Sequence, residues 1–282
     1  MRSLILAAAG MLGIAQAAAC ADLPKRIVMM WQVTGKNYAA DFRELKGMGV
    51  NVAQSFALAD MDPAYIDGFF REAEASGIGV VPFIGKFIEG EDATCALSAA
   101  GEAFVRAHAG KPSLLAWHTV DEPVNDRQTK ACQRRVYKQV KSIDPRHPVM
   151  VSINFTKQEE YDQYFDERAF DILDLHRYPN PDIGPAQQRL IDMFLANRSR
   201  DNYRVIVTLR AFDAPRKVMR LNMRTGDLDS QYDYFFRQKR ITDDIGFYGW
   251  RLAPNLGISQ LGELKLEFGR LSKEKLATAP NE

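Results

Sequence analysis

Several residue types are scarce in this sequence, and each shortage excludes a class of protein. The 282 residues include only four histidines and three cysteines, which are too scattered for the ligand set of a dedicated metal cage. The formal net charge is only +1, so the chain lacks the field that would attract nucleic acid or an anionic membrane surface. The segment 31–38 holds a single glycine and lacks a dinucleotide- or phosphate-binding fingerprint. We therefore expect no cofactor, no metal and no nucleic-acid partner.

The chain also lacks a linker rich in proline, glycine and serine, which indicates a single domain. Hydrophobic residues make up 46% of the sequence, enough for a full-sized core. We expect this domain to span residues 24–282 and the protein to be a monomer.

The one long apolar run lies at the N-terminus. Arg2 precedes the apolar segment 4–15, and Ala-Gln-Ala at 15–17 fits a small-x-small cleavage site. These features predict a signal peptide over residues 1–19 and a secreted or periplasmic protein. The run is too short to span a bilayer comfortably, and the alternative is a buried N-terminal helix. Cys20 follows "AAA", a poor lipoprotein box, so a lipid anchor is the minor alternative.

Short runs rich in β-branched residues alternate with longer amphipathic runs along the rest of the chain. This pattern predicts eight strands separated by helices. An α/β fold of this kind, in about 255 residues, matches a (β/α)₈ TIM barrel, with a doubly wound sheet as the alternative. The predicted strands span residues 26–32, 50–58, 78–85, 114–123, 148–154, 171–179, 204–212 and 246–252.

Two cysteines fall on neighbouring helices of such a barrel. Cys95 opens the helix predicted after the third strand, and Cys132 lies early in the helix after the fourth. An oxidising compartment would allow them to form a disulfide. A Cα separation well above roughly 7 Å would exclude that bond, and the alternative is a pair of buried free thiols.

The predicted strands end in polar and aromatic residues, and in a barrel these ends meet at one rim that carries the functional site. Each residue alone has a simpler explanation, as a helix cap or as packing. Together they provide aromatic faces, hydroxyl partners and acids, the requirements of a site for a carbohydrate substrate. The strand-end residues are Trp31, Gln32, His118, Asp121, Glu122, Asn154, Asp174, His176, Arg177, Tyr178, Arg210, Asp213, Trp250 and Arg251.

Three short motifs stand at these ends: Asp-Glu-Pro at 121–123, His-Arg-Tyr at 176–178 and Tyr-Gly-Trp at 248–250. Their combination and order resemble the (β/α)₈-barrel glycoside hydrolases related to clan A. The resemblance implies that Glu122 is the proton donor and that Trp250 is the platform beneath the sugar. It also implies that His176 and Tyr178 bind and orient hydroxyl groups. The substrate-binding residues that we expect are Trp31, Asp121, Asn154, His176, Tyr178, Arg210 and Trp250.

The sequence departs from that family in two places. Asp121 stands where the family has asparagine, and the strict alternation of a strand would turn it away from the side that Glu122 faces. The seventh strand offers Leu209 or Arg210 where the family has its nucleophilic glutamate. Asp174 and Asp213 are then the candidates for the second catalytic carboxylate, which favours an inverting reaction.

Two other functions stay open beside the glycoside hydrolase. Leu209 or Arg210 in place of the expected nucleophilic glutamate favours a barrel that binds glycans but does not hydrolyse them. A metal-dependent hydrolase would need a cluster of ligands, although the first strand ends without a His-x-His pair. The residues available for such a cluster are His118, His176, Asp121 and Asp174.

Overall fold

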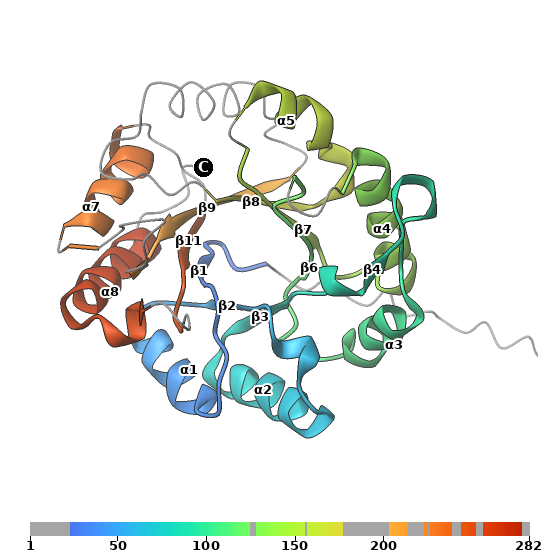
Figure 1. Ribbon diagram of the computed structural model, residues 1–282. Helices are drawn as coiled ribbons and strands as arrows, with labels where there is room; N and C mark the ends of the chain where they lie inside the picture. The colour runs from blue at the N-terminus through green and yellow to red at the C-terminus, as the bar shows by residue number, and fades with distance from the viewer. Residues whose placement is uncertain are drawn as a thin grey trace, which may run out of the picture.

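Eight parallel strands form a nearly closed barrel in the computed structural model, as the strand count predicts (Figure 1). The strands are β1 (Val28–Met30), β2 (Val52–Ser55), β3 (Gly79–Pro82), β6 (Trp117–Asp121), β7 (Val149–Ile153), β8 (Ile172–His176), β9 (Arg204–Arg210) and β11 (Asp244–Tyr248). They pair in the order β3-β2-β1-β11-β9-β8-β7-β6. The bridges Val80–Leu114 and Phe83–His118 join the two remaining edges. The structure describes residues 23–124, 128–155, 157–176, 203–213, 223–224, 226–238, 244–251 and 256–277, so the predicted signal peptide and Cys20 lie outside the described residues.

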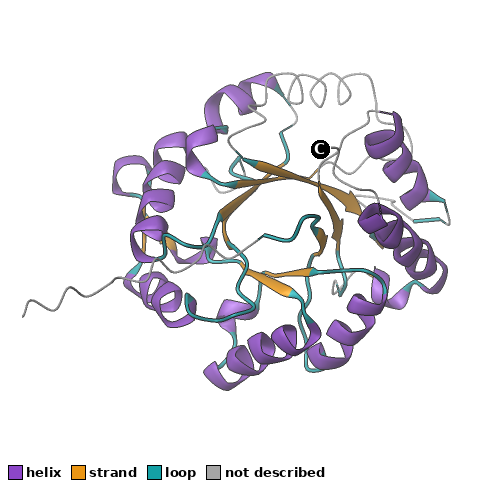
Figure 2. Cartoon of the chain, turned by 180° about the vertical axis from the view of Figure 1, so that it is seen from behind, coloured by secondary structure: helices purple, strands orange, loops and turns teal. Residues whose placement is uncertain are grey.

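Helices surround the strands, and Figure 2 shows this ring from the opposite side. Local signals set their ends: Asp62 accepts a hydrogen bond from the N–H of Tyr65, Pro63 takes the first helical position, and Gly77 ends α2 with φ of 62°, a backbone angle that favours glycine. None of the described helices is long and apolar enough to cross a membrane. The helices are α1 (Tyr38–Gly47), α2 (Pro63–Ser76), α3 (Ala99–His108), α4 (Lys130–Ile143), α5 (Gln158–Tyr164), α7 (Asp227–Tyr232), which continues as π-helix over Asp233–Gln238, and α8 (Gly262–Ala277).

The alternation of side chains along the strands divides the core into two clusters. Val28 and Met30 belong to the outer cluster between sheet and helices, whereas Met29 and Trp31 belong to the inner cluster that fills the barrel. Above these apolar residues the interior carries a layer of buried polar side chains, each at most 2% exposed. This layer contains Gln54, His118, Ser152, Asp174, His176 and Thr208.

The third βα connection differs from the expectation. A short hairpin of β4 (Ile88–Glu89) and β5 (Ala96–Leu97) precedes α3, so Cys95 lies in this hairpin and not on the helix. The disulfide to Cys132 is nevertheless present, with a Cα separation of 5.2 Å. Gln139 of α4 also bonds both the N–H and the carbonyl of Leu97. The hairpin is therefore tied to the helix that follows the loop carrying Glu122.

Candidate active site

Glu122 lies at the carboxyl end of β6, in the mouth of the barrel. Its side chain is half-buried, and its Oε1 accepts a hydrogen bond of 3.1 Å from Asn154 Nδ2, beyond the end of β7. Its N–H donates to Ser152 O at 3.0 Å. The backbone has φ of 52°, in the left-handed region, which costs a residue other than glycine about 1 to 3 kcal/mol and is most often retained at functional sites.

A bulge in β6 turns Asp121 to the same mouth. His118 is paired with Met150 and Val120 with Val151, so Thr119 is the extra residue. The register shift places Asp121 opposite Ser152, whose hydroxyl lies inside the barrel, 3.1 Å from His118 Nε2. The expectation from strict alternation therefore does not hold for Asp121, because a bulge breaks the period of two.

Aromatic side chains line the mouth around Trp31, which is fully buried at its floor. The Trp31 ring lies 5.5 Å from Phe56 and 5.8 Å from Tyr248 between centroids. Tyr248 and Phe56 are both half-buried, and the Tyr248 hydroxyl accepts a hydrogen bond of 3.2 Å from Gln32 Nε2. Burial raises the pKa of Tyr248, and the charges of Asp121 and Glu122 add to that shift. The phenol is therefore neutral, with apolar faces of the kind that stack on sugar rings.

His118 is a neutral member of the polar layer. Its Nε2 lies 2.8 Å from the Val120 carbonyl and its Nδ1 lies 3.2 Å from Gln54 Nε2. A carbonyl can only accept, so Nε2 carries the proton and Nδ1 accepts from the amide. Burial, together with the charge of His176, lowers the pKa of His118 to about 3.

His176 forms a buried pair with Asp174 on the same face of β8. His176 Nε2 lies 2.6 Å from Asp174 Oδ2, and the two side chains are 2% and 0% exposed. Burial opposes a charge on the imidazole, but the Asp174 carboxylate, helped by Asp121 and Glu122, outweighs it and raises the pKa of His176. The carboxylate of Asp174 is thus enclosed beneath the mouth and does not reach the surface where a substrate would bind.

The remaining predicted residues are placed as follows. Arg210 ends β9 and is 3% exposed, with its Nε 3.1 Å from Met223 Sδ. Trp250 is fully buried in the outer cluster, where Lys265 of α8 lies over its ring, so it does not share the mouth with Glu122. Asp213 ends β10 (Phe212–Asp213), which pairs with β12 (Leu256–Gly257), and the position of its side chain, like all of Tyr178, lies outside the described residues.

The sequence interpretation missed several residues of the mouth. Phe56 and Phe83 pack on each other at 5.0 Å, and Tyr248 takes the place expected for Trp250 because β11 ends at Tyr248. Counting inward positions from Val52 and Val81 would have identified both phenylalanines. Within the described residues, no group of three or more histidine, cysteine, aspartate or glutamate side chains is arranged to hold a metal ion.

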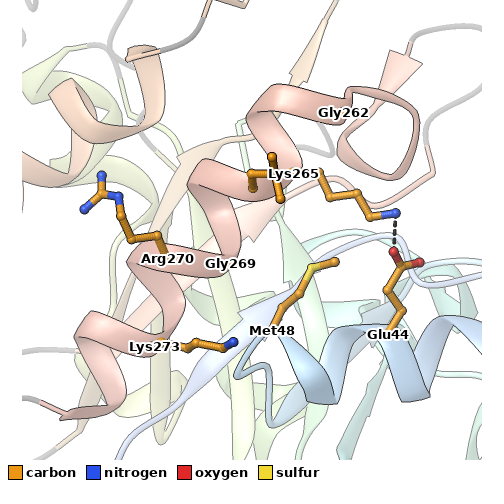
Figure 3. Close-up of a pocket in the computed structure, with 8 residues that line it drawn as sticks. Glu44, Met48, Gly262, Lys265, Gly269, Arg270 and Lys273 are labelled. Atoms are coloured by element: carbon orange, nitrogen blue, oxygen red, sulfur yellow. Dashed lines mark ion pairs between the residues drawn. The ribbon is translucent and has the colours of Figure 1, made fainter.

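A separate groove of about 470 Å³ lies on the outer ring of helices, between α1 and α8 (Figure 3). Glu44 and Lys265 form an ion pair across it, and Leu266 on its wall is 78% exposed. None of the residues of the mouth lines this groove. It therefore belongs to the packing of two helices and not to the candidate active site.

Solved structures with the same fold include several described as glycosidases. A protein from Bacteroides thetaiotaomicron, provisionally assigned as an α-L-fucosidase, superposes with a TM-score of 0.60 at 13% identity, over 88% of this chain and 93% of its own. The β-galactosidase of the haloarchaeon Halorubrum lacusprofundi gives 0.62 at 10% identity, over 89% of this chain and 58% of its own. The β-glucuronidase of Lactobacillus rhamnosus superposes with a TM-score of 0.59 at 14% identity, over 91% of this chain and 50% of its own.

At these identities the likeness is one of fold, a TIM-type barrel that glycoside hydrolases share. The chain spans 58% and 50% of the length of the β-galactosidase and the β-glucuronidase. No family model and no curated protein sequence matches the chain.

Proposed function

We propose that the protein is a glycoside hydrolase in which Glu122 is the general acid. The observation that carries this proposal is the place of Glu122: a half-buried carboxyl group at the carboxyl end of the fourth barrel strand, held by Asn154 at 3.1 Å. The half-buried rings of Phe56 and Tyr248 line the same mouth, against Trp31. A carboxylic acid so placed can give its proton to a glycosidic oxygen while the rings support the sugar.

We assign to Asp121 the role of the second carboxylate. The bulge brings it to the mouth beside Glu122, whereas Asp174 is enclosed by His176 and Thr208. An ionised Asp121 would stabilise the positive charge that develops on the sugar ring in the oxocarbenium-like transition state. Asp121 thus replaces Asp174 as the carboxylate that acts on the substrate.

The experiment is a screen of the purified protein on neutral and anionic polysaccharides and on aryl glycosides. We expect the release of reducing ends or of the aryl alcohol from at least one substrate, with loss of release in Glu122→Gln. A control variant, Glu74→Gln, changes an exposed carboxylate of α2 and should retain full activity. Absence of release from every substrate would contradict the proposal.

A second candidate function is a barrel that binds glycans without turnover. The observation that favours it is Arg210, which occupies the end of β9 and pairs in register with Tyr248, where the related hydrolases carry a nucleophile. Calorimetry distinguishes the two functions: heat of glycan binding by the wild-type protein, with no product after prolonged incubation, would select the binder.

We further propose that the protein is exported and that residues 1–19 are removed, leaving one barrel domain over 24–282. The disulfide between Cys95 and Cys132 supports this proposal, because such bonds persist in oxidising compartments. Mass spectrometry of the protein isolated from the periplasm and the medium tests it. An intact N-terminus on a cytoplasmic protein would contradict export.

A further inference from the structure

A chain of buried polar side chains crosses the barrel beneath the mouth. Trp31 Nε1 donates to Thr208 Oγ1 at 3.1 Å, and Thr208 Oγ1 donates to Asp174 Oδ1. The other oxygen, Asp174 Oδ2, lies 2.6 Å from His176 Nε2. The chain therefore links β1, β9 and β8 and ends at the imidazole.

Gly246 makes this chain geometrically feasible. Its strand, β11, lies between β1 and β9, and Gly246 is the partner of Thr208 in the register. A Cβ at Gly246 would collide with Thr208 Oγ1 and would lie 3.2 Å from Trp31 Nε1. The missing side chain leaves the space through which the indole N–H reaches across β11 to the threonine hydroxyl.

Both oxygens of Asp174 are thus engaged below the mouth, one with a hydroxyl and one with an imidazole. The side chain is 0% exposed, so it cannot contact a substrate directly. We propose that Asp174 is a positioning residue, which fixes the orientation of His176 and places a counter-charge against its Nε2. This inference rests on the proposed function only for its effect on turnover, since the charge of His176 is a property of the free protein.

The charged and titratable groups around His176 agree with this role. Asp174 lies on β8, the strand that also carries His176. Asp121 and Glu122, at the end of β6, interact electrostatically with His176. The ring of Tyr248, on β11, lies 5.6 Å from the imidazole of His176 between centroids. His118 of β6 also acts on it electrostatically, but that imidazole is neutral. Three carboxylates around one imidazole favour its protonated form.

When it is protonated, His176 offers the mouth a positive charge that interacts with the carboxylates of Asp121 and Glu122. Asp174 holds Nε2, so the ring cannot turn about its axis without losing the ion pair, and the same face of the imidazole stays toward the mouth. Such a group can orient a sugar hydroxyl and limit the repulsion between Asp121 and Glu122. Loss of the Asp174 charge should therefore affect turnover more than ground-state binding.

The experiment follows the histidine side chains by nitrogen-15 NMR as a function of pH, in the wild type, Asp174→Asn and Asp174→Glu. The sequence has only four histidines, and His176→Asn identifies the resonance of His176. We expect His176 to titrate above the ordinary range of histidine in the wild type and in Asp174→Glu, and at least one pH unit lower in Asp174→Asn than in the wild type. If the asparagine variant does not fold, Asp174→Ser carries the same expectation.

An internal control is present in the same spectra. His147 pairs with Asp144 at 2.6 Å, outside the polar layer beneath the mouth, so its resonance should not respond to a change at Asp174. A His176 midpoint that is the same with aspartate and asparagine at position 174 would overturn the inference.

Kinetics provide the second measurement. On any substrate that the protein hydrolyses, Asp174→Asn should lower kcat at least tenfold and change KM less than about threefold, and it should shift the pH profile. Unchanged kcat and an unchanged pH profile would overturn the role in turnover. A shifted His176 midpoint in a protein without glycosidase activity would contradict the proposed function and leave the positioning of His176 supported.

Discussion

His118 and His176 contact the same indole ring edge-on, at 5.2 and 4.3 Å from the centroid of Trp31, and their pKa values move in opposite directions. His118 has an amide and a carbonyl around it, so burial dominates and its pKa falls. His176 has a carboxylate at 2.6 Å, which outweighs burial. The polar layer thus contains one neutral imidazole and one that favours the charged form.

The neutral His118 predicts a dependence of stability on pH. Its pKa is about 3 in the folded protein and near 6.5 in an unfolded chain. As the pH falls below about 6.5, the unfolded chain binds a proton that the folded protein does not, so the free energy of unfolding falls by up to about 1.4 kcal/mol per pH unit until about pH 3.

Urea denaturation between pH 7 and pH 4, in the wild type and in His118→Asn, isolates this contribution. The variant is expected to lose less stability over that interval, because asparagine does not titrate. Equal losses in the two proteins would show that His118 takes up its proton over the same pH range in the folded and the unfolded protein.

Glu122→Gln keeps the shape of the side chain and removes its titrating proton. We expect the variant to fold and to bind glycans as the wild type does, while kcat falls on the order of a hundredfold or more. Aryl glycosides with a good leaving group need little protonation, so the loss on these substrates should be smaller. A loss that is the same for good and poor leaving groups would exclude a role for Glu122 as proton donor.

Gly246→Ala should disrupt the hydrogen bonds from Trp31 through Thr208 to Asp174, which forms the ion pair with His176. The added methyl group would displace Thr208 Oγ1, and we expect a destabilisation of about 1 to 3 kcal/mol, as for other overpacked sites. Gly262→Ala is the matched control, because a Cβ there would meet nothing within 4 Å. The melting temperatures of both variants are measured by thermal denaturation. A melting temperature of Gly246→Ala equal to that of the wild type would contradict the close approach of Thr208 to Gly246.

The disulfide should contribute strongly to stability. Cys95 and Cys132 are 37 positions apart. Closing such a loop lowers the conformational entropy of the unfolded chain, which raises the free energy of unfolding by about 4 kcal/mol. Cys132→Ser, and the wild type treated with a reductant, should both unfold at lower denaturant concentration than the oxidised wild type. The same midpoint for oxidised and reduced protein would exclude this contribution.

The fold was predictable from the sequence because the pattern of apolar runs is regular. Eight segments with strand character alternate with amphipathic helices, and this number and order favour the barrel and its rim over a doubly wound sheet. The inward direction of Asp174 and His176 was predictable for the same reason, since both share the parity of Ile172 in the inner cluster.

The details of the site were not predictable, because they depend on local departures from that regularity. The bulge at Thr119 reverses the direction of the Asp121 side chain. The residue types in "WHTVDEP" do not predict a bulge at this position. β11 ends two residues before Trp250, which places that ring outside the barrel. Thr208 and Gly246 gain their importance only from being neighbours across two strands, a relationship that a linear sequence does not display.

The most direct test of a sugar site at the mouth is a crystal structure of Glu122→Gln with an oligosaccharide that the wild-type protein cleaves or binds. We predict a glycosidic oxygen within about 2.6 to 3.2 Å of the side chain at position 122, with a sugar ring against Tyr248 or Phe56. An oligosaccharide bound away from the mouth, such as in the groove between α1 and α8, would contradict the assignment of Glu122 and of the site itself.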